Sequence, residues 1–123
     1  MERLTPSEEE LMRLMWQHNG GQLSELIPHL ENPKTPYTTV ASTAKNLQRK
    51  GYVSSRMYGH TYLYTPEICE NDYKTKFMSG IVNNYFENSY KEMVSFFAKK
   101  QKISAKELQE IIKLIENGDE TSK

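Results

Sequence analysis

The sequence predicts a mainly α-helical fold with one small β-ribbon, followed by a helical C-terminal segment. Three observations predict it. Three segments of helical periodicity come first, and two short runs typical of strands follow them. The third of these helices carries cations and small hydroxyl groups, without any carboxylate, on its outward face. Beyond Pro66, aromatic and aliphatic residues recur at helical spacing again.

The composition is typical of a soluble, ordered chain that is long enough for one domain with an appendage. The protein has 123 residues, of which 26% are charged and 37% hydrophobic. No apolar run approaches the roughly 20 residues of a membrane span, and the N-terminus lacks the hydrophobic region of a signal peptide. We therefore expect a cytoplasmic protein without membrane insertion.

Residues suited to catalysis or metal binding do not gather in the sequence. The single Cys69 excludes an internal disulfide and a cysteine-cluster metal site. His18, His29 and His60 show no ligand spacing, so neither a metal site nor a cofactor is predicted. Because no nucleophile–base pairing and no glycine-rich phosphate loop occur, we expect that the protein is not an enzyme.

The formal net charge of zero hides an uneven distribution of charge along the chain. Residues 1–32 hold six Glu against two Arg, whereas residues 33–66 hold five Lys and Arg residues and no Asp or Glu. We call residues 33–66 the acid-free stretch. Chance clustering is one explanation, but such a stretch is typical of a surface that meets phosphate groups.

The first two helices are predicted from their capping residues and apolar spacing. Thr5 to Glu8 form a capping box with Pro6 at the first helical position, and Asn19-Gly20-Gly21 ends the helix. A second helix is expected over about residues 23–30, with Pro28 near its middle, so that the helix is either bent there or starts late.

The third helix is predicted from Thr35 as N-cap and Pro36 at the first helical position to Lys50, before Gly51. At 100° per residue, one face carries Val40, Thr43, Ala44 and Leu47, and the opposite face carries Thr38, Ser42, Lys45 and Arg49, with Thr39 and Asn46 at the flanks. Small hydroxyls allow close approach to phosphates and base edges, and cations supply charge and donors. This face therefore favours DNA binding.

Two strands over residues 53–58 and 61–65 are expected to form a hairpin with a type II′ turn at Gly59-His60. Three helices followed by a β-ribbon, with a basic third helix, predict a winged helix-turn-helix. The predicted DNA contacts are Tyr37, Thr38, Thr39, Ser42, Thr43, Lys45, Asn46, Arg49, Lys50, Arg56, Tyr58, His60 and Tyr62.

The C-terminal segment contains three further helical stretches, the last beginning at Ser104 as N-cap with Glu107 three residues on. Their apolar residues need a covering surface, which is either the body of the same subunit or a second subunit, and we favour the second subunit. The predicted dimerisation residues are Tyr73, Phe77, Ile81, Tyr85, Met93, Phe96, Phe97, Leu108, Ile111, Ile112 and Ile115. We expect a DNA-binding domain at 1–68, a dimerisation domain at 69–118 and a disordered tail at 119–123.

Several segments carry a family resemblance that spans essentially the whole chain. They are Leu4-Thr5, residues 10–16, 37–40, Leu47 with residues 50–53, residues 62–66, 96–100 and 103–108. In order and spacing they resemble the penicillinase and methicillin-resistance repressor family (the BlaI/MecI type), which also includes the copper-responsive CopY repressors. The cysteine pairs of the copper-responsive branch are absent, so copper sensing is not expected.

The resemblance implies a homodimer that represses genes from an operator with dyad symmetry. It also implies induction by proteolysis, in which a membrane sensor triggers cleavage within the dimerisation segment. Matching that segment places the candidate cleavage site between Phe96 and Phe97, with Phe96 at the position where the family usually has Asn. Asn46 stands where many members have Arg, and Lys45 is the neighbouring cation.

A winged helix also occurs as a protein-interaction module without DNA binding, because a fold alone does not decide a function. The outward face of the third helix discriminates between the two. An interaction module would expose apolar or acidic side chains there, whereas this sequence places hydroxyls and cations. We therefore favour a DNA-binding repressor.

Overall fold

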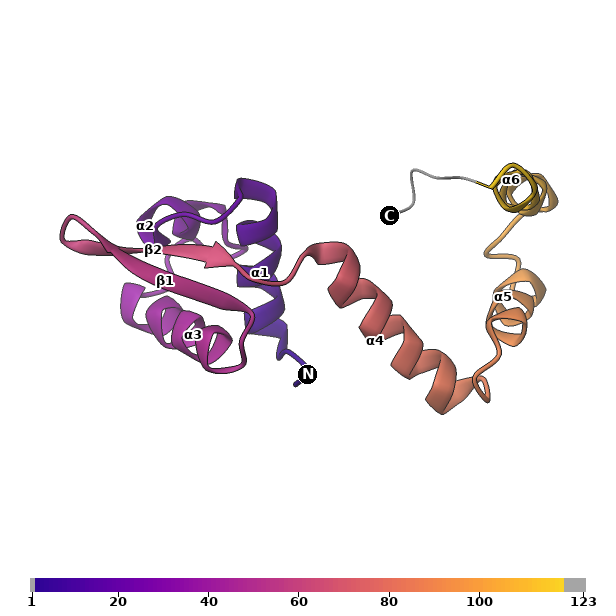
Figure 1. Ribbon diagram of the computed structural model, residues 1–123, viewed down its shortest axis with the longest axis horizontal. Coiled ribbons are helices and arrows are strands. Elements are labelled where there is room, and N and C mark those ends of the chain that lie inside the picture. Colours follow the sequence, from indigo (N-terminus) through magenta and orange to yellow (C-terminus); the bar gives the residue numbers. More distant parts are fainter. Residues whose placement is uncertain (1, 119–123) are drawn as a thin grey trace. The chain divides into compact units, whose positions relative to one another are not determined.

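The computed structural model describes residues 2–118, and helices account for most of this part of the chain (Figure 1). The elements are α1 (Pro6–His18), α2 (Leu23–Leu26), η1 (Ile27–His29), α3 (Tyr37–Arg49), β1 (Val53–Tyr58), β2 (Thr61–Pro66), α4 (Glu70–Tyr85), α5 (Tyr90–Lys99) and α6 (Ala105–Glu116). The predicted mainly helical fold with a small β-ribbon is confirmed. The predicted tail at 119–123 lies outside the described residues.

The chain divides within α4 into two compact units, Met1–Phe77 and Met78–Lys123. The division lies beyond the boundary between residues 68 and 69 that the sequence suggests. The reason is that Tyr73 and Phe77, in the first half of α4, pack within the first unit. The assignment of separate DNA-binding and dimerisation roles to the two parts stays a prediction.

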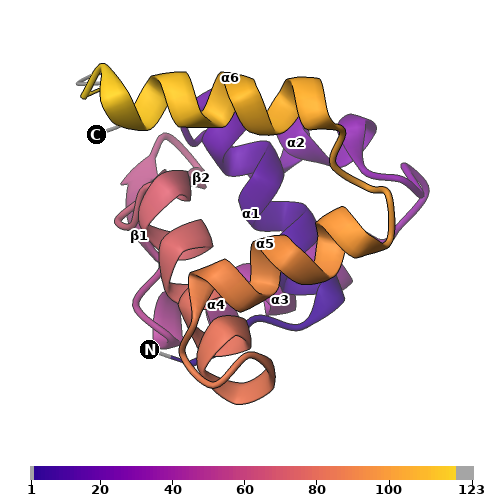
Figure 2. The same ribbon diagram turned by 90° about the vertical axis from the view of Figure 1, so that its right-hand side faces the viewer.

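α1 is the central element of the first unit and contacts α2, α3 and β2 (Figure 2). Its residues Leu11, Met12 and Met15 are fully buried, as are Leu47 of α3 and Tyr52 in the turn that follows α3. The remaining core residues are Leu4, Leu14, Leu23, Leu26, Val40, Ala44, Val53, Tyr64 and Tyr73. Burial of each large apolar side chain stabilises the fold by about 1.5–3 kcal/mol, so this core holds α3 firmly against α1.

The predicted start of α1 is confirmed. The Glu8 amide donates to Thr5 Oγ1 at 3.2 Å, and the Thr5 amide donates to Glu8 Oε1 at 2.9 Å, which completes the capping box. The helix ends at His18, and its C-cap Asn19 has a φ of 58°, which lies in the left-handed region.

Two predicted helix bounds differ from those of the structure. The second helix is not a regular α-helix over residues 23–30, and it changes near Pro28, where a bend was one of the two expectations: α2 ends at Leu26 and a 3₁₀ turn follows, since Pro28 has no amide hydrogen to continue an α-helix. Thr35 is not the N-cap of α3, because its hydroxyl donates to the Asn32 carbonyl at 2.6 Å, and Pro36 takes the N-cap position.

β1 and β2 form the predicted hairpin, with antiparallel register from Val53 opposite Pro66 to Tyr58 opposite Thr61. The φ angle is 66° at Gly59 and is not positive at His60, which fits the predicted type II′ turn. The hairpin is joined to the helices by a bridge between Gly21 and Tyr64, with both backbone hydrogen bonds at 2.9 Å. Figure 1 shows its turn extending beyond the helices of the first unit, as a wing does.

The second unit consists of the end of α4 with α5 and α6. Val82 is fully buried there, and the rings of Phe86 and Phe96 meet edge to face at 5.6 Å between centroids. α6 begins with the predicted capping box, in which Ser104 and Glu107 exchange hydrogen bonds of 2.8 and 3.1 Å.

Candidate nucleic-acid interface

α3 presents the outward face that the sequence predicts. Val40, Ala44 and Leu47 are buried in the core. The side chains of the opposite face and its flanks are exposed: Tyr37, Thr38, Thr39, Ser42, Lys45, Asn46 and Arg49. This exposed face belongs to the acid-free stretch, so its cations are available to a phosphate backbone.

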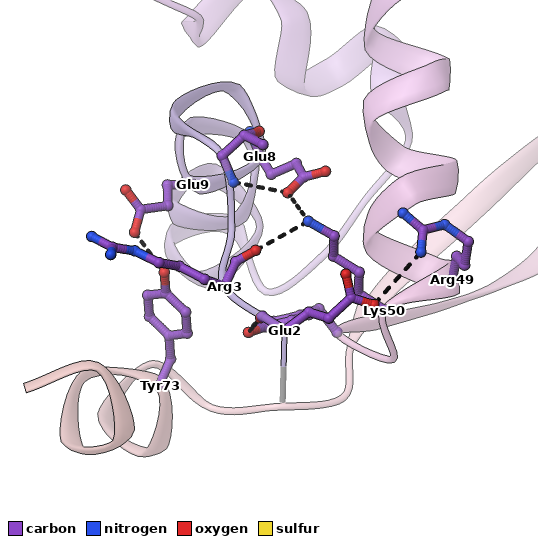
Figure 3. Close-up of polar contacts among 9 residues, drawn as sticks. Glu2, Arg3, Glu8, Glu9, Arg49, Lys50 and Tyr73 are labelled. Carbon is purple, nitrogen blue, oxygen red and sulfur yellow. Dashed lines mark hydrogen bonds and ion pairs between the residues drawn. The ribbon is translucent and has the colours of Figure 1, made fainter. Parts of the chain in front are cut away.

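Thr43 and Lys50 differ from the other predicted contacts on α3. Thr43 is half-buried, and its hydroxyl donates to the Thr39 carbonyl at 3.1 Å, so the helix backbone already holds that proton. The Lys50 ammonium donates to Glu8 Oε1 at 2.6 Å and to the Arg3 carbonyl at 3.1 Å (Figure 3). Both members of the Glu8–Lys50 pair have nearly buried side chains, 5% and 7% exposed. Lys50 therefore serves the fold and is not free to meet a phosphate.

Glu8 is held as a carboxylate by its surroundings. Burial raises the pKa of Glu8, but hydrogen bonds from Lys50 and from the Thr5 amide, with the charge of Lys50, outweigh burial and lower the pKa below 4.5. The pair joins the start of α1 to the end of α3, which fixes how the exposed face of α3 is presented.

Arg49 is exposed, but it forms an ion pair with Glu2, which lies outside the acid-free stretch. Its Nη1 lies 3.6 Å from Glu2 Oε1, and the two side chains are 61% and 63% exposed (Figure 3). An ion pair this exposed contributes little free energy, so a phosphate group can displace Glu2.

The strand register separates the residues of the wing that the sequence analysis grouped together. Arg56 and Tyr58 lie on one face of the ribbon, with the guanidinium 5.9 Å from the Tyr58 ring centroid. Tyr62 lies opposite Met57 and therefore on the other face, which carries the buried Tyr64. His60 is exposed at the turn. The wing thus offers two different surfaces, one cationic and one aromatic.

Two exposed residues near this surface were missed by the sequence analysis. Gln48 of α3 meets β1 through a hydrogen bond of 3.0 Å between its Oε1 and the Ser55 hydroxyl, which ties the wing to the helix. Lys34 is exposed in the turn before α3. The sequence could have indicated Lys34, because it belongs to the acid-free stretch, whereas the Gln48–Ser55 contact depends on tertiary packing.

The comparisons with known proteins decide the family. The family model described as "Penicillinase repressor" matches residues 4–117. The chain belongs to the penicillinase repressor family. The penicillinase repressor of Bacillus licheniformis is 25% identical over 115 residues, which cover 93% of this chain and 90% of that protein. The penicillinase repressor of Staphylococcus aureus is 22% identical over 109 residues, 88% of this chain and 86% of that protein.

Membership of the penicillinase repressor family confirms the family resemblance that the sequence suggested, and it makes the chain a transcriptional repressor rather than an enzyme. In the part of this repressor that the structure describes, no helix is both long and apolar enough to cross a membrane.

Tyr73, one of the predicted dimerisation residues, is buried within its own subunit. Its hydroxyl donates to Glu9 Oε2 at 2.5 Å (Figure 3). Its ring contacts those of Trp16 and Tyr52. Burial and the Glu9 carboxylate raise the pKa of Tyr73 far above its usual range. Phe77 stacks on Tyr73, and the Arg3 guanidinium lies 4.7 Å from the centroid of the Phe77 ring. The body of the same subunit therefore covers the start of α4.

The second unit of the repressor leaves most of its predicted dimerisation residues open. Ile81, Met93 and Leu108 are half-buried. The exposed fractions of the others are 78% for Tyr85, 46% for Phe96, 38% for Phe97, 42% for Ile111, 50% for Ile112 and 73% for Ile115. Large apolar side chains left uncovered in this way, here on α4, α5 and α6, are typical of a surface that a further chain covers.

Proposed function

We propose that this repressor binds an operator with dyad symmetry as a homodimer, with the N-terminal half of α3 in the major groove. The exposed, acid-free face of α3 carries the proposal. Thr39 and Ser42 read base edges in the groove, while Lys45 and Arg49 bind phosphates. Arg56 on the wing binds the neighbouring backbone. Lys50 and Thr43 position this surface and do not contact DNA.

The second unit joins the two subunits. Leu108, Ile111, Ile112 and Ile115 follow one another at helical spacing along α6, and three of the four are exposed. A second copy of this chain covers this stripe, because a two-fold operator calls for a symmetric pair of α3 helices. Joining two half-site binders raises the affinity through effective concentration.

Induction proceeds by cleavage between Phe96 and Phe97 by a sensor-triggered protease. The two residues lie in α5, both partly exposed, and their rings meet edge to face at 5.3 Å. Because a protease binds an extended segment, α5 must open locally before cleavage. Cleavage would separate α6 from the contact between Phe86 and Phe96, and the dimer would lose its stability.

Sequencing of the genomic DNA fragments that the purified protein retains tests the proposal. We expect enrichment of a short sequence with dyad symmetry, and binding of that sequence that weakens steeply with salt. A variant with Lys45→Ala and Arg49→Ala should lose the enrichment. If the wild-type protein enriches no sequence, the surface of α3 serves a protein partner instead.

A further inference from the structure

The structure brings together two histidines that lie eleven positions apart in the sequence. His18 is the last residue of α1, and His29 is the last residue of η1. Their ring centroids are 4.7 Å apart with an interplanar angle of 39°, and both side chains are exposed. The 3₁₀ turn at Pro28, in place of an α-helical turn, sets the position of His29.

The spacing of the two rings fits the binding of one metal ion between them. Imidazole nitrogens bind Zn²⁺ at about 2.0–2.1 Å, so two imidazoles on one ion at an angle between 90° and tetrahedral have centroids about 5 Å apart. The observed separation of 4.7 Å is close to this value. Exposed rings can turn about their side-chain bonds to direct one nitrogen each at a common point.

We propose that His18 and His29 form a two-imidazole site for a divalent transition metal ion of the class that prefers nitrogen ligands, such as Zn²⁺ or Ni²⁺. Among the described residues, no group of three or more His, Cys, Asp or Glu side chains stands close enough to hold an ion. Water therefore fills the remaining positions of the ion. The site shares no residue with the proposed DNA interface.

An ion at this site links the end of α1 to η1, the short segment that precedes α3. Because an unfolded chain does not keep the two histidines together, the ion binds the folded state preferentially and raises its stability. The stabilisation grows with the concentration of the ion, which gives a second readout that does not depend on DNA binding.

The test uses the full-length, untagged protein with Cys69→Ser, because the exposed Cys69 thiol would itself bind these ions. Isothermal titration calorimetry with ZnCl₂ or NiCl₂ alone should give one ion per chain. His18→Ala and His29→Ala should each weaken binding of the ion about tenfold or more. The double variant should bind the ion no more weakly than the more strongly affected of the two single variants. His60→Ala, at the wing, is the matched control and should bind like the parent protein.

Nuclear magnetic resonance of the imidazole rings and thermal unfolding complete the test. The signals of His18 and His29 should change together on addition of the ion while those of His60 stay in place, and the melting temperature should rise in the parent but not in the single variants. Two weakly bound ions per chain, one lost in each single variant, would overturn the proposal. So would a double variant that binds the ion as tightly as the parent protein does.

Discussion

The ammonium of Lys50 lies 2.6 Å from Glu8 Oε1, with both side chains almost removed from solvent. This contact joins the N-terminal capping box of α1 to the C-terminal end of α3, across 42 positions of the sequence. A residue that would count as a DNA contact by charge alone thus acts in the fold of the repressor. The distinction between Lys50 and its neighbour Arg49 leads to predictions for stability and for binding.

Removal of Lys50 should destabilise the protein strongly. Lys50→Met leaves the Glu8 carboxylate buried without its cation, and breaking one partner of a buried pair costs about 3 kcal/mol or more. Arg49→Met removes an exposed cation one position earlier and should change stability by no more than about 0.5 kcal/mol. Urea unfolding at one fixed protein concentration measures both. Equal effects of the two changes would mean that the pair does not hold α3.

The Glu8–Lys50 pair should also make the protein sensitive to acid. The folded-state pKa of Glu8 lies below its ordinary value of 4.5, so its contribution is fully present above that value and is lost as the pH falls through the folded-state pKa. We expect stability to decrease from about pH 5 downwards. Glu8→Gln should be less stable at pH 7 and should show a shallower loss on acidification. Unfolding curves between pH 7 and pH 3 provide the measurement, and an unchanged acid slope would exclude this role.

The sequence predicts local features of this fold well and tertiary ones less well. The capping boxes at Thr5 and Ser104 and the turn at Gly59 were predictable because their causes lie within four residues of chain. The pairing of Lys50 with Glu8 and the burial of Tyr73 were not, because helical periodicity shows which face is apolar but not which distant side chain meets it.

Lys45 and Arg49 should provide phosphate contacts, and their loss should show in the salt dependence of binding. Replacement of both by Ala should weaken binding to every DNA sequence and reduce the magnitude of the log–log salt slope by about one per lost contact. Fluorescence anisotropy titrations from low to moderate salt give the slope. Lys34→Ala tests in the same way whether the exposed cation before α3 contacts a phosphate. An unchanged slope in the double variant would remove Lys45 and Arg49 from the interface.

Thr39 and Ser42 should contribute to the reading of base edges. Val at either position removes the hydroxyl, and we expect a loss of about 1–3 kcal/mol in operator binding while nonspecific binding is kept. Thr43→Val is the matched control, because the Thr43 hydroxyl bonds to the helix backbone and should not contribute to specificity. Competition titrations with operator and random duplexes measure the ratio. If both kinds of binding fall together, these hydroxyls position the protein and do not read the sequence.

Dimerisation should depend on the apolar stripe of α6. Ile112→Glu or Ile115→Glu places a charge in the proposed interface, and desolvation of that charge should shift the protein towards monomers. Leu114→Glu is the matched control: Leu114 is 52% exposed, similar to the 50% of Ile112, but at 100° per residue it lies outside the stripe, about 110° from its centre. Analytical ultracentrifugation of the full-length variants should show monomers for the first two and dimers for the third.

A truncation that keeps the first unit whole provides the complementary test of dimerisation. The chain should end after Phe77 rather than after Pro66, because Tyr73 completes the core against α1 and the Trp16 ring nitrogen donates to the Ile68 carbonyl at 2.8 Å. We expect this shortened protein to be a folded monomer that binds the operator more weakly than the intact dimer. Ile112→Glu in the full-length chain should lower operator affinity in the same way, while the phosphate contacts of α3 stay unchanged. A shortened protein that stays dimeric, or that binds the operator as tightly as the intact chain, would show that the second unit does not join the subunits. Cleavage between Phe96 and Phe97 would then be no route to induction.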